Sequence, residues 1–147
     1  MTPFLTDTEI DRVALGLIDR SLPKPEWTHA AHFAAALWLL KHRGLRAMQE
    51  MAPLIMAYNE ATGVANTDCS GYHETITLVS LRAASFWLRN RPDSPLHRVL
   101  GEMLATPIGR SDWVFTYWSK PLLFSVRARK SWVEPDLAPL PDEFSPW

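Results

Sequence analysis

Residues 27–40, with the sequence WTHAAHFAAALWLL, form the longest strongly apolar stretch of this 147-residue chain that has no Asp, Glu, Lys or Arg. Thr28 is a suitable N-terminal cap, because its hydroxyl can accept a hydrogen bond from a free backbone N–H of the first turn. Gly44 is a typical stop signal. Apolar residues lie on nearly every side of the helix between them, which is the pattern of a buried helix. The stretch therefore predicts the central helix of an all-α domain, and it is too short to span a bilayer.

Helical spacing of apolar residues continues on both sides of this stretch. Upstream, the capping box TDTE at residues 6–9 predicts a first helix that ends before Pro23. Downstream, residues 45–61 predict a third helix, with a kink or a break at Pro53, which lacks a backbone donor.

Residues 72–90 are ambiguous between strand and helix. Residues 75–78, TITL, alternate as a strand would, whereas apolar residues recur at helical spacing over the longer window. No turn signal precedes Arg91, so the length of the segment favours a helix. We expect its cap at Ser70.

The last third of the chain is divided by prolines. Ser94 followed by Pro95 predicts the start of another helix, and Ser111 and Ser119 are expected to cap two short ones. The prediction is a single compact helical bundle of five to seven helices over residues 1–134. An extended, Pro-rich, acidic tail over residues 135–147 should pack on the same domain, held by Trp132, Leu137 and Leu140.

Composition limits the class of partner and the compartment. The net charge of −1 gives no electrostatic case for binding nucleic acid or an anionic membrane. Cys69 is the only cysteine, which excludes an intrachain disulfide and a Cys-rich zinc site. A single cysteine fits a reducing compartment, and the N-terminal sequence does not resemble a signal peptide, so we expect a cytoplasmic location. An exposed surface rich in the seven tryptophans would favour a homodimer.

Four residues suggest a metal site at the N-termini of the second and fourth helices. His29 and His32 are three positions apart and leave one helix face, and His73 and Glu74 lie at the start of the fourth helix. Imidazole and carboxylate are ligands that Zn, Fe, Ni and Mn share. Glu74 is either a ligand or a general base, and Thr77, one turn beyond His73, is a candidate to support the site. The first hypothesis is thus a metal-binding protein, or a metal-dependent enzyme.

Two other interpretations stay open. In one, the histidines are core or capping groups with satisfied hydrogen bonds. In the other, the protein is a non-catalytic binding or regulatory module that holds a small organic anion or a partner peptide in a helical groove. Helix N-termini favour anions, and Arg127 and Arg129 could supply bidentate contacts. Of the two arginines, Arg129 is the one more expected to be a surface charge balanced by the acidic tail, so Arg127 is the candidate, with Tyr72 and Thr77 as further ligand-binding candidates. His32 is the sharpest test, because a buried imidazole without a partner is costly.

Three strings look like those of a group of small uncharacterised bacterial proteins. They are T-H-x-x-H from Thr28, Y-H-E-T-I-T from Tyr72, and A-R-x-x-W-V-x-P-D-L from Ala128. No activity is established for that group. The resemblance implies a bacterial cytosolic origin and marks these strings as functional candidates.

Overall fold

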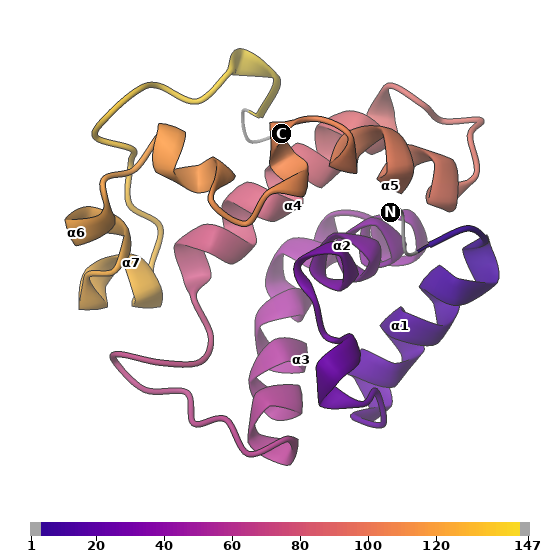
Figure 1. The fold of residues 1–147 in the computed structure, drawn as a ribbon, viewed down its shortest axis with the longest axis horizontal. Helices are drawn as coiled ribbons and strands as arrows, with labels where there is room; N and C mark the ends of the chain where they lie inside the picture. Colours follow the sequence, from indigo (N-terminus) through magenta and orange to yellow (C-terminus); the bar gives the residue numbers. More distant parts are fainter. Residues whose placement is uncertain (1–3, 145–147) are drawn as a thin grey trace.

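The structure, a computed structural model, describes residues 4–144 of the chain (Figure 1). It is all-α, and these residues form no strand. The α-helices are α1 (Asp7–Asp19), α2 (His29–Arg43), α3 (Ala47–Ala61), α4 (Glu74–Arg89), α5 (Leu96–Leu104), α6 (Lys120–Leu123) and α7 (Val126–Lys130). Short 3-10 helices cover Lys24–Glu26, Gly44–Arg46, Pro107–Gly109, Trp113–Thr116 and Asp142–Phe144. The predicted all-α bundle is confirmed, with seven α-helices in the described part of the chain.

Helix α2 is the centre of the bundle, as predicted. The hydroxyl of Thr28 accepts a hydrogen bond from the N–H of Ala31 at 3.2 Å, which caps its first turn. Most of its later residues are buried, from Phe33 to Leu37 without exception. The four long helices α1, α3, α4 and α5 all contact it.

Residues 74–89 form helix α4, so the longer periodicity was the correct guide. The cap is His73 rather than Ser70, because the Nδ1 atom of His73 accepts a hydrogen bond from the N–H of Ile76 at 3.2 Å. Ser70 belongs to the preceding loop, where its hydroxyl donates to the carbonyl of Ala65. The helix therefore begins three residues later than a cap at Ser70 would place it.

Helix α3 continues through Pro53, so the break considered at this position does not occur. Pro53 is exposed, and so is Gln49, whose carbonyl lacks the N–H partner that residue 53 would otherwise provide.

The first turn of α5 is capped from a distant helix. Asp7, at the start of α1, accepts hydrogen bonds from the backbone N–H and from Nδ1 of His97, at 2.9 and 2.7 Å. Ser94 was therefore the wrong cap, and the helix begins one residue after Pro95.

The short helices were predicted in part. Ser119 caps α6 as expected, with its hydroxyl accepting from the N–H of Leu122 at 3.3 Å. Ser111 caps no helix, since residue 112 precedes the 3-10 helix there and provides no side-chain cap. Ser125, which the sequence reasoning missed, caps α7.

The segment after α7 runs along the body to Phe144. The indole of Trp118 donates to the carbonyl of Val133 at 3.0 Å, and the carboxylate of Asp136 accepts from the backbone and hydroxyl of Ser119. Trp132 and Leu140 pack against the core as predicted.

Two details of this segment differ from the expectation. Leu137 is not an apolar anchor, because its side chain is 59% exposed, and only its N–H bonds to the body, at the carbonyl of Tyr117. The segment also ends in a 3-10 helix that buries Phe144. Residues 145–147, the end of the predicted tail, lie outside the described residues.

The tryptophans in the described residues are buried or half-buried, and none belongs to the large exposed apolar side chains. The Trp-rich surface that would have favoured a homodimer is therefore not found in residues 4–144, and the homodimer stays a prediction.

None of the helices in residues 4–144 is long and apolar enough to cross a membrane.

Candidate functional site

His73 is held by two backbone groups. Its Nε2 atom lies 2.6 Å from the carbonyl oxygen of Leu123, and Nδ1 accepts from the N–H of Ile76. Nε2 must therefore carry the proton, which fixes one neutral tautomer. Burial and the charge of Arg129 hold the pKa of His73 below its ordinary value, although the bond to Leu123 acts in the opposite direction. With both nitrogens engaged, His73 has no lone pair left for a metal.

His29 and His32 are also bound to the backbone. Nε2 of His29 donates to the carbonyl of Ile108 at 2.8 Å, and Nδ1 of His32 donates to the carbonyl of Thr28 at 2.7 Å. The ring of His32 lies on the indole of Trp27, with 3.9 Å between their centroids. Burial lowers the pKa of His32 to about 4, and the charge of His29 also lowers it, against the bond to Thr28. His32 therefore has hydrogen-bonding and stacking partners of its own.

The four predicted metal ligands are not brought together as a set. Within residues 4–144, no group of three or more His, Cys, Asp or Glu side chains is placed to hold a metal ion. The histidines instead bond to the carbonyls of Thr28, Ile108 and Leu123, which lie in three different parts of the chain. Joint binding of Zn, Fe, Ni or Mn by the four predicted ligands would require these side chains to rearrange.

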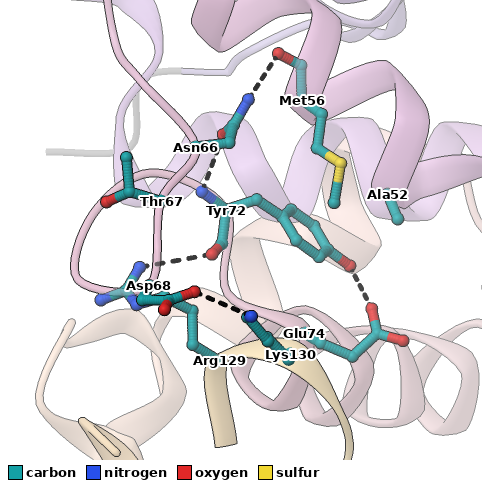
Figure 2. A pocket seen from close by; sticks show the side chains of 9 residues that line it. All are labelled: Ala52, Met56, Asn66, Thr67, Asp68, Tyr72, Glu74, Arg129 and Lys130. Atoms are coloured by element: carbon teal, nitrogen blue, oxygen red, sulfur yellow. Dashed lines mark hydrogen bonds and ion pairs between the residues drawn. The ribbon is translucent and has the colours of Figure 1, made fainter. Parts of the chain in front are cut away.

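Glu74 belongs to a pocket of about 450 Å³ (Figure 2). The pocket lies between α3, the loop of residues 62–73, the start of α4 and α7. Its lining combines an apolar side from α3 with polar and charged side chains: Ala52, Met56, Asn66, Thr67, Asp68, Tyr72, Glu74, Arg129 and Lys130. Two of the predicted site residues, Tyr72 and Glu74, are therefore found in one cavity.

Tyr72 is fixed at both ends in this pocket. Its hydroxyl donates to Oε1 of Glu74 at 2.5 Å, while its carbonyl accepts from Nη1 of Arg129 at 3.3 Å. Burial raises the pKa of Tyr72 well above its ordinary value, and the bond to Glu74 raises it further. The hydroxyl of Thr77, within hydrogen-bonding reach of the phenol, acts in the opposite direction. The phenol thus stays protonated and donates to the carboxylate. Tyr72, Glu74 and Thr77 form one cluster.

Arg129 provides the guanidinium of the pocket, whereas the predicted Arg127 is exposed and lies outside it. Nη1 of Arg129 donates to the carbonyls of Gly71 and Tyr72, and its buried Nε has no partner among the described residues. Residues two apart on a helix point to nearly opposite sides, so only one of the two arginines can face the pocket. The sequence contains no signal that chooses between them.

Asn66 is a positioning residue that the sequence reasoning missed. Its Oδ1 accepts from the N–H of Tyr72 at 3.0 Å, and its Nδ2 donates to the carbonyl of Met56 (Figure 2). The same Oδ1 also accepts from Nδ2 of Asn59 at 3.0 Å. One amide thereby ties the loop to α3 and sets the place of Tyr72. The turn-rich composition of residues 64–71 was the only local indication.

Comparison of the chain with protein-family models, with curated protein sequences and with solved structures gives no match.

Proposed function

We propose that this protein is a binding module that holds a small organic anion in the pocket between α3, α4 and α7. The proposal rests mainly on the environment of the Arg129 side chain. Its guanidinium lines the pocket, has no carboxylate partner among the described residues, and uses only Nη1 for hydrogen bonds to the protein. A guanidinium with donors to spare is suited to a carboxylate or phosphate.

The surroundings of Arg129 support a small ligand rather than a large one. The pocket volume of about 450 Å³ lies in the range of small-molecule sites. The second cation of the lining, Lys130, already pairs with Asp68 at 2.8 Å, so one anionic group is the natural complement. A cytosolic location remains part of the proposal, since the exposed thiol of Cys69 has no partner in the chain for a disulfide.

Isothermal titration calorimetry with valerate, a short monocarboxylate, tests this proposal, and amide chemical shifts locate the binding site. We expect the shifts to change in residues 62–77 and α7. Arg129→Gln should weaken valerate binding about tenfold or more, because a hydrogen-bonded ion pair is lost.

Arg127→Gln is the matched control, since it removes the same charge from the same helix at an exposed position. It should leave valerate binding within about twofold of the unaltered protein. Absence of binding, or equal effects of the two substitutions, would contradict the proposed anion site.

A further inference from the structure

The pocket contains two opposite charges that form no ion pair within the described residues. Glu74 and Arg129 form no ion pair with any described residue, while the neighbouring charges Asp68 and Lys130 pair with each other. An unpaired carboxylate and an unpaired guanidinium in one pocket are complementary to a ligand with both charges.

Tyr72 holds these two charges apart. Arg129 donates to the backbone carbonyl of Tyr72, and Glu74 accepts from its phenolic hydroxyl, so the charges lie at opposite ends of one residue (Figure 2). The bonds at both ends keep the phenol ring between them. Glu74 and Arg129 therefore bond to different ends of Tyr72, and both line the pocket.

The side of the pocket formed by α3 is apolar. Ala52 and the partly exposed Met56 line it, and no charged residue of α3 belongs to the lining. An aliphatic chain between the two charged groups of a ligand would bury its methylenes there, away from water.

We propose that the ligand is an α,ω-amino acid, with its carboxylate on Arg129, its ammonium group on Glu74 and its methylene chain beside Ala52 and Met56. This inference rests on the proposed function, because it assigns the class of anion that the pocket takes. Oε1 of Glu74 accepts a hydrogen bond from the phenol of Tyr72, and Oε2 has no partner among the described residues. The carboxylate can therefore accept a further hydrogen bond from an ammonium group. A dicarboxylate would instead bring a second negative charge to Glu74.

Calorimetric titration with four probes tests the inference: δ-aminovalerate, valerate, pentylamine and glutarate. We expect δ-aminovalerate to bind at least tenfold more tightly than valerate or pentylamine, and glutarate to bind more weakly than valerate. The homologues γ-aminobutyrate and ε-aminocaproate then measure the distance between the two charged groups.

Glu74→Gln should abolish the preference for δ-aminovalerate over valerate and leave valerate binding unchanged or improved. Tyr72→Phe is the companion variant, since it keeps the ring and the carbonyl but removes the hydrogen bond that positions Glu74; the preference should fall without disappearing. If Glu74→Gln fails to fold, the four-probe comparison on the unaltered protein decides alone.

The outcomes separate the two proposals. Equal affinity for valerate and δ-aminovalerate would overturn the amino-acid inference and leave the anion site intact. Binding of none of the acids would overturn the proposed function itself. Preference for pentylamine over both acids would contradict the assignment of Arg129 as the anchor.

Discussion

The Nε2 atom of His73 donates to the carbonyl oxygen of Leu123, fifty positions along the chain and 2.6 Å away. This bond ties the start of α4 to the end of α6, while the other ring nitrogen caps α4. A histidine placed like a metal ligand in the sequence therefore joins two helices through its neutral form. The sequence neighbours of His73, Tyr72 and Glu74, line the pocket.

His73→Ala should lower the free energy of unfolding by about 2 kcal/mol or more, because both the cap and the partner of a buried carbonyl are lost. Urea denaturation followed by circular dichroism measures the change. His73→Asn is the control, since asparagine is a good cap but is too short to reach Leu123, and it should recover part of the loss. Equal stability of the alanine variant and the unaltered protein would show that neither bond matters.

His32 should make the protein less stable in mild acid. Its pKa is lowered from 6.5 to about 4 in the folded state, so between these values the unfolded chain binds more protons. Stability is therefore full above pH 6.5 and is lost as the pH falls towards 4. The full shift of the pKa corresponds to a loss of about 3 kcal/mol. The loss due to His32 should be smaller than this, because its side chain is only half-buried and water screens its charge. His32→Gln should reduce this pH dependence. The measurement is the free energy of unfolding of the unaltered protein and of the variant at several pH values between 4 and 6.5. The same pH dependence in both proteins would contradict the role of His32.

Gly71→Ala should disturb the pocket, whereas Gly63→Ala should not. Both glycines have positive φ, +80° and +86°, but an added Cβ at Gly71 would lie 2.5 Å from the carbonyl of Ala65 and 2.7 Å from Oδ1 of Asn66. Gly63 has open space, so its substitution carries only the backbone strain of about 1–2 kcal/mol.

The Gly71 variant should therefore lose more stability than the Gly63 variant, and its amide shifts should change at Tyr72 and Asn66. Thermal unfolding and amide spectra of both variants provide the measurement. Equal losses of stability in the two variants, with unchanged amide chemical shifts at Tyr72, would contradict this prediction. They would mean that the loop accommodates the added Cβ without moving Tyr72.

Elemental analysis of protein purified without a polyhistidine tag should find no stoichiometric Zn, Fe, Ni or Mn. The reason is the geometry of His73, whose two nitrogens are committed to Leu123 and Ile76. The melting temperature should be the same with and without a chelator, because a ligand that binds only the folded state would raise it. One equivalent of metal, lost on His32→Ala, would instead restore the metal site and Glu74 as its candidate base.

Local sequence was sufficient for the helices and for part of the pocket. Thr28, Gly44 and the apolar residues between them predict α2 because capping and burial patterns act within a few turns. Tyr72, Glu74 and Thr77 form one cluster because residues at a helix start and one turn later are neighbours in any fold that keeps α4.

Only the tertiary structure decided which distant groups complete these local arrangements. Asp7 rather than Ser94 caps α5, the carbonyl of Leu123 accepts the hydrogen bond from His73, and Arg129 rather than Arg127 reaches Tyr72. Each choice depends on how two helices far apart in sequence are oriented against each other, and a rotation of α7 by two residues would exchange the two arginines. The packing of the core sets that orientation, through contacts that no local pattern records.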